Sequence, residues 1–159
     1  AYQDITIPFQ MSSVEFFTMV KEHLNENGVM VVNMNMRGNN EGNINQYLSD
    51  TIASVFDHIV TVDVDGSTNR ELYASSNADM VKTLENNANE TGHSDLRDMM
   101  LHVADTSSVY EAGDYIMTDD KAPVELLGMQ VIDQLIQGEV AYYKDIFEKD
   151  GINGLLESL

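Results

Sequence analysis

The chain has 159 residues, of which 43% are hydrophobic and 22% charged, enough for one domain with a sizeable core. No apolar run is long enough to predict a membrane span, and the lack of cysteine excludes disulfides and thiolate metal sites and fits a cytoplasmic setting. The net charge of −19 disfavours nucleic acid and anionic membrane surfaces, and favours cationic ligands such as polyamines or metal ions, although a solvated acidic surface explains it more simply.

The first quarter of the sequence predicts a helix followed by a buried strand. Ser12 and Glu15 form a capping-box pattern, in which the serine accepts from a first-turn amide and the glutamate reaches back to it. Apolar residues then recur with the period of a helix until Asn27 and Gly28, which tolerate the left-handed conformation that ends helices. Residues 29–36 begin with consecutive apolar residues, a pattern typical of a strand covered on both faces of a parallel sheet.

The middle of the chain predicts a helix and then an antiparallel hairpin. Apolar residues at helical spacing indicate a helix over about 44–55. Residues 58–64 alternate as a strand does, residues 65–69 have turn composition, and residues 70–76 supply the second strand. The order helix, strand, helix, strand, strand indicates an α/β protein.

The C-terminal half predicts mainly helices. They are expected over 78–87 and from Ser94 onward. A short extended piece, residues 115–117, leads into a helix over 123–137, whose first residue is a proline that suits a first helical turn. A further amphipathic helix is expected over 139–149, with a short tail after it.

Asp119, Asp120 and Glu125 gather negative charge around the junction that precedes the helix at Pro123. Two interpretations of this charge are open. Carboxylates stabilise the amino-terminal end of a helix by roughly 0.3–1 kcal/mol, which explains all three residues. Alternatively, at least one of them faces a cationic substrate such as an amine.

Metal sites are not indicated by the sequence. Residues 63–66 hold two aspartates and a glycine, but their spacing does not match a calcium loop, and a hairpin turn explains them. The four histidines lack the spacing of metal ligands.

Two segments resemble the spermidine synthase-like family. Residues 118–125, T-D-D-K-A-P-V-E, are similar to the family's T-D-D-x-A-P-V-E segment, and residues 1–17 to its D-A-[FY]-x-x-D-x-x-I-P-x-x-x-[ST]-x-x-E-F-F segment. The resemblance covers most of the chain. It implies the C-terminal half of a Rossmann-like methyltransferase sheet, with a parallel strand, an antiparallel hairpin and flanking helices. Residues 1–159 would form a single partial domain, the acceptor-side half of a catalytic domain.

The resemblance implies that the intact protein is a transferase, moving an aminopropyl group from decarboxylated S-adenosylmethionine to putrescine. One alternative is an S-adenosylmethionine-dependent methyltransferase-like protein, and another is a non-catalytic acidic module that binds polyamines or mediates oligomerisation. The chain lacks a Gly-rich nucleotide turn after a first strand. We therefore expect the co-substrate site and the family's catalytic aspartate upstream of Ala1, no bound cofactor here, and no activity from this chain alone.

Five residues are the site candidates that the resemblance implies. Better-known spermidine synthases carry a second aspartate in a D-[SA]-x-D pattern; Gln3 occupies its position here and Asp4 follows one residue later, which leaves the accepted polyamine open. Asp4 is the catalytic candidate, with a solvated loop acid as the other interpretation. Gln3, Asp119, Asp120 and Glu125 are the substrate-binding candidates.

The apolar strand over 29–36 would form an exposed edge without the fourth strand of the family's sheet beside it. We therefore expect a homo-oligomer through this edge, or an edge that the chain's own N-terminal residues cover.

Overall fold

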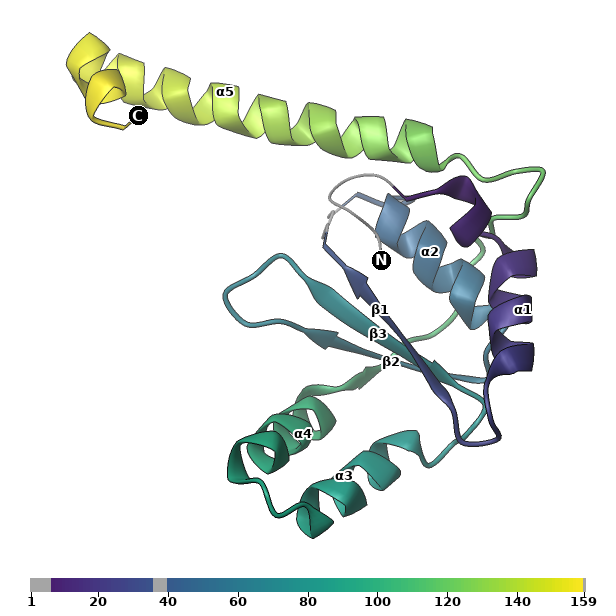
Figure 1. The fold of residues 1–159 in the computed structure, drawn as a ribbon. Helices are drawn as coiled ribbons and strands as arrows, with labels where there is room; N and C mark the ends of the chain where they lie inside the picture. The colour runs from purple at the N-terminus through teal and green to yellow at the C-terminus, as the bar shows by residue number, and fades with distance from the viewer. Residues whose placement is uncertain (1–6, 36–39, 159) are drawn as a thin grey trace.

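The computed structural model describes residues 7–35 and 40–158, which form an α/β arrangement around one sheet (Figure 1). Its strands are β1 (Val29–Met34), β2 (His58–Asp63), β3 (Arg70–Ser75) and β4 (Ser108–Val109). They lie in the order β1-β3-β2-β4, and every neighbouring pair is antiparallel.

The predicted hairpin is confirmed, whereas the predicted parallel pairing of the first strand is not found. β2 and β3 pair from His58 opposite Ser75 to Asp63 opposite Arg70. β3 also pairs antiparallel with β1, so it lies between β1 and β2, which run in the same direction without bonding to each other. The apolar run in β1 indicates burial but does not specify the direction of the adjacent strand. The parallel pairing was predicted from this run, and it was wrong for that reason.

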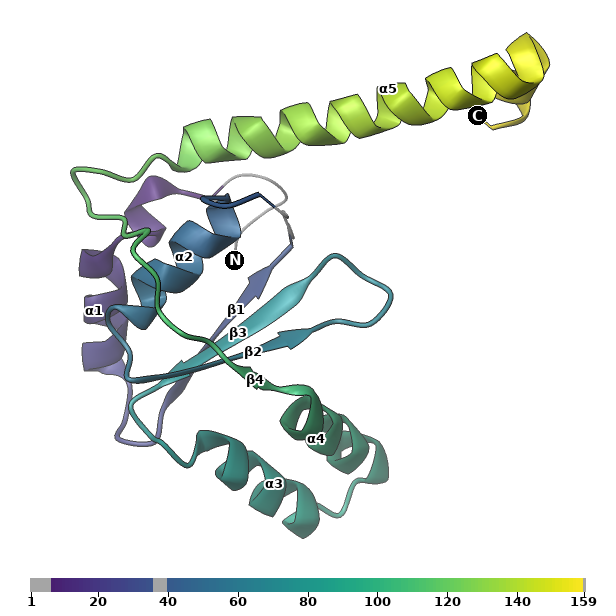
Figure 2. The ribbon, with the colours of Figure 1, turned by 180° about the vertical axis from the view of Figure 1, so that it is seen from behind.

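Helices cover both faces of the sheet (Figures 1 and 2). After a short 3-10 helix, η1 (Phe9–Met11), come α1 (Val14–His23) and α2 (Ile44–Ala53), which pack on one face. α3 (Met80–Glu90) and α4 (Ser94–Thr106) form a helical hairpin on the other face. The main core lies between the sheet and the first helix pair. Its buried residues include Phe17, Val32, Met34, Leu48, Ile52, Ile59, Leu72, Ala74 and Met117.

The start of α1 differs by one residue from the prediction. Ser13, not Ser12, is the N-cap, and its Oγ accepts from the Phe16 amide at 3.3 Å. Ser12 Oγ donates instead to the Phe9 carbonyl at 2.8 Å, which completes the turn of η1. The predicted capping box is therefore wrong, because the preceding turn already engages Ser12 and leaves Glu15 available for another partner.

α5 (Val124–Glu157) continues without a break through residue 138, where a boundary between two helices was predicted. Gly138, at the expected break, lies inside the helix. An interior glycine destabilises a helix by about 1 kcal/mol relative to alanine, which is too little to end one without a proline or a cap beside it. Helical geometry is interrupted at Gly151, whose φ of 63° lies in the left-handed region, so α5 is kinked close to the helix end that the sequence predicted at residue 149.

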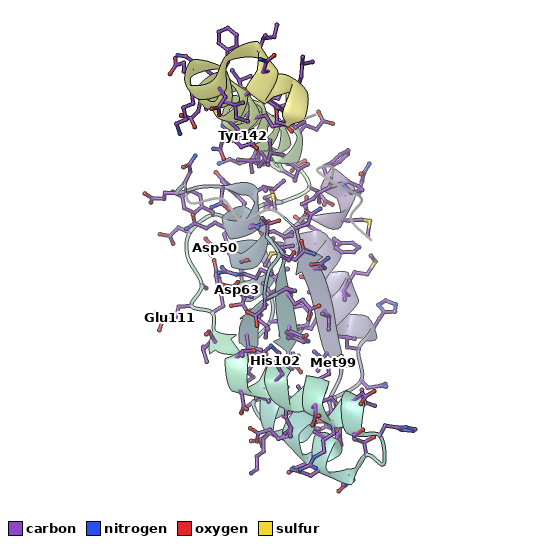
Figure 3. The ribbon with its side chains drawn as sticks, turned by 90° about the vertical axis from the view of Figure 1, so that its left-hand side faces the viewer. Asp50, Asp63, Met99, His102, Glu111 and Tyr142 are labelled. Carbon is purple, nitrogen blue, oxygen red and sulfur yellow. The ribbon has the colours of Figure 1, made fainter. Side chains whose placement is uncertain are left out.

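α5 extends away from the sheet and touches the body near its start, where it contacts α2 (Figure 1). Much of its apolar surface is exposed, including Tyr142 (Figure 3). The exposed large apolar side chains on α5 are Leu126, Met129, Ile132, Leu135, Ile136, Val140, Tyr142, Phe147, Ile152 and Leu156. Within the described residues, no helix combines the length and apolarity needed to cross a membrane.

Candidate functional site

Residues 118–121, here called the acidic turn, carry Asp119 and Asp120 at their tip. Thr118 and Lys121 close the turn through two backbone hydrogen bonds, with the Lys121 amide 2.9 Å from the Thr118 carbonyl and the Thr118 amide 3.1 Å from the Lys121 carbonyl. Both aspartates are exposed. The two carboxylates that the sequence singled out are thus presented to solvent on a closed turn.

The acidic turn is bound to the amino-terminal end of α1. Ser13 Oγ donates to Asp119 Oδ1 at 2.5 Å, and the Asp119 amide donates to Glu15 Oε2 at 3.0 Å. Just before the turn, the Met117 carbonyl accepts from the Val14 amide at 2.9 Å. Glu15 thereby joins Asp119 at one site, an association between residues about a hundred positions apart that no local pattern indicates. The helix N-terminus also favours the negative charge gathered there.

Asp120 and Glu125 are placed differently from Asp119. Among the described residues, Asp120 forms no hydrogen bond or ion pair, and so its carboxylate is free to meet a ligand. Glu125 is exposed in the first turn of α5, and no hydrogen bond in the described part of the chain joins it to the acidic turn. Of the three carboxylates that the sequence grouped, the structure places Asp119 and Asp120 together on the acidic turn. Glu125 lies apart from them, on α5. The candidates Gln3 and Asp4 lie outside the described residues.

An open groove of about 320 Å³ lies beside the acidic turn. Asp119 and Glu15 contribute its carboxylates, and Phe16 and Met19 contribute apolar wall. Phe9 and Gln10 complete the lining. Carboxylates attract an ammonium group, whereas an apolar wall contacts methylenes, so the groove suits a short alkyl amine.

Two residues of α2 that sequence analysis missed hold the segment leading to the acidic turn. Asp50 is 1% exposed, and its carboxylate accepts from the Tyr110 hydroxyl at 2.6 Å and from the amides of Gly113 at 3.0 Å and Tyr115 at 3.1 Å. The neighbouring Thr51 is fully buried, and its Oγ1 accepts from the Met117 amide at 2.9 Å. This connecting segment, residues 110–117, runs from β4 past α2 toward α5 (Figure 2).

A weak signal for these residues was present in the sequence. Thr51 falls three residues after Leu48 on the apolar stripe of α2, where a polar side chain needs a buried partner. Asp50 lies beside it on the same helix (Figure 3). Burial, and then the hydrogen bond to Asp50, raises the pKa of Tyr110 above its ordinary value, so the hydroxyl keeps its proton, and with it the bond to Asp50, at alkaline pH as well as neutral pH.

Asp63, one of the two aspartates at the hairpin turn, is paired with Arg70. Arg70 Nε donates to Asp63 Oδ1 at 2.7 Å, across the strand ends that the turn connects. In the described part of the chain, no group of three histidine, aspartate or glutamate side chains is arranged to hold a metal ion.

Comparison with known proteins agrees with the resemblance found in the sequence. No family model matches the chain. A probable polyamine aminopropyl transferase from Bifidobacterium longum (strain NCC 2705) is 50% identical over 176 aligned positions, which take in 100% of this chain and 40% of that protein. The chain thus spans less than half the length of this relative. The predicted resemblance to the spermidine synthase-like family is confirmed, and the chain is a homologue of a C-terminal portion of a polyamine aminopropyl transferase.

Proposed function

We propose that this chain is the acceptor-side half of an aminopropyltransferase catalytic domain. In the intact protein the reaction is transfer of an aminopropyl group from decarboxylated S-adenosylmethionine to putrescine. The observation that carries this proposal is the 50% identity to a probable polyamine aminopropyl transferase over the whole chain. The exposed carboxylates of the acidic turn and the groove beside them support it, because the acceptor is a dication.

The chemistry requires an uncharged amine to attack the methylene carbon next to a sulfonium. The new C–N bond forms as the C–S bond breaks, and the sulfur takes the bonding electron pair and leaves as a neutral thioether. Asp119 and Glu15, which line the groove, would bind the distal ammonium of the acceptor together with the adjacent exposed Asp120, and the wall at Phe16 and Met19 would contact its methylenes. Removal of a proton from the attacking amine calls for a carboxylate base, and Asp4 is our candidate in this chain. Gln3 and Glu125 are proposed as further contacts to the amine.

A non-catalytic polyamine-binding module is the second candidate, favoured by the net charge of −19 and by carboxylates that remain exposed. Methyl transfer from S-adenosylmethionine is the third. The fold does not distinguish these activities, because related folds host many reactions. Mass spectrometry of the amine product separates aminopropyl from methyl transfer when the complete gene product is assayed with both co-substrates. An inactive complete product that still binds polyamine would support the module.

Putrescine is expected to bind this chain at the acidic turn. Titration followed by NMR should shift the amides of Asp119 and Asp120, and the affinity should fall as salt is raised, since exposed charges are screened. The matched control is 1,4-butanediol, which has the same length without the charges and should shift neither amide. Equal responses to the diamine and the diol would contradict an electrostatic amine site.

We also propose that the edge of the sheet at β1 pairs with a second copy of the chain. β1 is the terminal strand among those described, and its Val29 and Val31 are 40% and 53% exposed. An open apolar groove of about 440 Å³, lined in part by Phe16, Val20 and Met30, runs beside this strand. An apolar edge with unpaired backbone groups is a template for strand pairing.

Val31→Lys is expected to convert an oligomer into a monomer, because a charged side chain on an edge strand opposes pairing. Light scattering coupled to gel filtration measures the change. Met99→Lys on α4 introduces the same charge at a side chain that is 57% exposed, and it should leave the oligomer intact. A monomeric unmodified chain, or an oligomer that both substitutions leave unchanged, would contradict pairing through β1.

A further inference from the structure

We propose that Asp50 is a positioning residue, which holds the acidic turn in the geometry that binds the amine. This inference rests on the proposed function, since it assigns a role toward the same site. Asp50 does not reach the amine itself: its carboxylate is buried beneath the connecting segment, and the acidic turn begins directly after that segment.

Within the described residues, the hydrogen bonds of the Asp50 carboxylate all come from the connecting segment. Each of its three hydrogen bonds is donated by that segment, and none comes from its own helix. A carboxylate that only accepts matches this arrangement of donors. Such charge-assisted bonds are stronger than neutral ones, and so Asp50 restrains three separate points within six residues of chain, from Tyr110 to Tyr115.

Thr51 continues the same restraint to the edge of the acidic turn. Its Oγ1 donates to the Tyr47 carbonyl at 2.6 Å and accepts from the Met117 amide at 2.9 Å. The Tyr115 ring packs on Tyr47 with 4.9 Å between ring centroids. The Met117 carbonyl accepts from the Val14 amide in the first turn of α1. Hydrogen bonds to α2 or α1 therefore hold the backbone at both ends of residues 115–117.

Glycine at position 113 shows how closely the segment approaches Asp50. A Cβ placed on Gly113 would lie 2.5 Å from Asp50 Oδ2 and 3.1 Å from its Cγ. The backbone therefore approaches the carboxylate at a point where no side chain fits. A buried carboxylate costs free energy unless its hydrogen bonds are satisfied, so the arrangement stabilises one geometry of the segment over others.

The test compares putrescine dissociation constants for the 159-residue chain with those of Asp50→Asn, Asp120→Asn and the double variant. Asn at position 50 keeps the shape and one acceptor oxygen, but it loses the negative charge, and its NH2 group replaces the second acceptor and would face a donor of the segment. We expect Asp50→Asn to weaken binding by about fivefold or more, and to shift the NMR amide signals of Asp119 and Asp120 in the folded protein. In the Asp120→Asn background, the Asp50→Asn change should weaken binding by less than about twofold, because both act through one turn.

A second pair of variants keeps the inference testable if Asp50→Asn does not fold. Tyr110→Phe removes one donor to Asp50 and should weaken binding in the same way. Tyr73→Phe is its matched control, because Tyr73 is also partly buried and donates to a carboxylate, that of Glu71, away from the turn. It should leave both the dissociation constant and the turn's amide signals unchanged.

The outcomes separate the two proposals. If Asp120→Asn weakens binding while Asp50→Asn and Tyr110→Phe leave it and the turn's amide signals unchanged, the positioning role is wrong and the amine site stands. Full additivity of the Asp50 and Asp120 effects would also overturn the positioning role. If Asp120→Asn itself has no effect, the amine site proposed at the turn is wrong, and the role of Asp50 toward it falls as well.

Discussion

Asp120→Asn is expected to lower kcat/KM for putrescine about ten- to a hundredfold in the complete gene product, equivalent to roughly 1.4–2.7 kcal/mol. The exposed Asp120 carboxylate forms no hydrogen bond or ion pair within the described residues, so its charge remains available to an ammonium group. A hydrogen bond to a charged partner contributes about 1.5–3 kcal/mol, and the amide retains the shape of the side chain but not its charge. Steady-state kinetics with varied putrescine measures the loss.

The control for this prediction is Asp98→Asn on α4, which removes the same charge from an exposed position on the opposite face of the sheet. It should leave kcat/KM within about twofold of the unmodified enzyme, since distant exposed charges are screened. Asp119→Asn adds a second comparison, because its remaining side-chain oxygen can still accept from Ser13 and keep the turn in place. If Asp120→Asn and Asp98→Asn behave alike, only the general charge of the protein matters.

Gly113→Ala is expected to lower the free energy of unfolding by about 1–3 kcal/mol, the range for inserting atoms into a closely packed site. The new methyl group would meet a carboxylate that three hydrogen bonds hold in place, so neither side can move without losing a bond. Urea unfolding followed by circular dichroism gives the measurement.

Gly138→Ala is the matched control, and it is expected to raise the free energy of unfolding rather than lower it. Nothing lies near its Cβ position, and the residue is inside α5. Alanine favours the helix over glycine by about 1 kcal/mol, so α5 should gain rather than lose stability. A Gly113→Ala chain as stable as the unmodified one would show that the connecting segment moves away from Asp50 at little expense, and would weaken the case for a fixed geometry there.

The elements that sequence analysis predicted well depend on local patterns. Helical spacing identified α1 and α2, and alternation with a turn between identified the β2–β3 hairpin. The errors arose where a local signal has two structural outcomes. Gly138 resembles a helix end but lies within α5, and adjacent serines at 12 and 13 both resemble an N-cap although only Ser13 is one.

Only the part of the site that depends on local patterns was predicted. Asp119 and Asp120 were found because they stand together before a helix and match a family segment. Asp50 and Glu15 were missed, since their partners lie 60–65 and 104 positions away along the chain. The spacing of residues along a short stretch of sequence predicts one helix or strand at a time. It does not predict which loop packs against which helix.

By itself, the amino-acid sequence determined the α/β class, the hairpin, the acidic character and the resemblance to the spermidine synthase-like family. These properties depend on composition, on the periods of helix and strand, and on short motifs. Only the tertiary structure decided that β3 lies between β1 and β2, that the acidic turn is bound to α1, and that a buried carboxylate on α2 holds the segment before it. The physical reason is that hydrogen bonds between distant segments form only after packing has brought their backbones together.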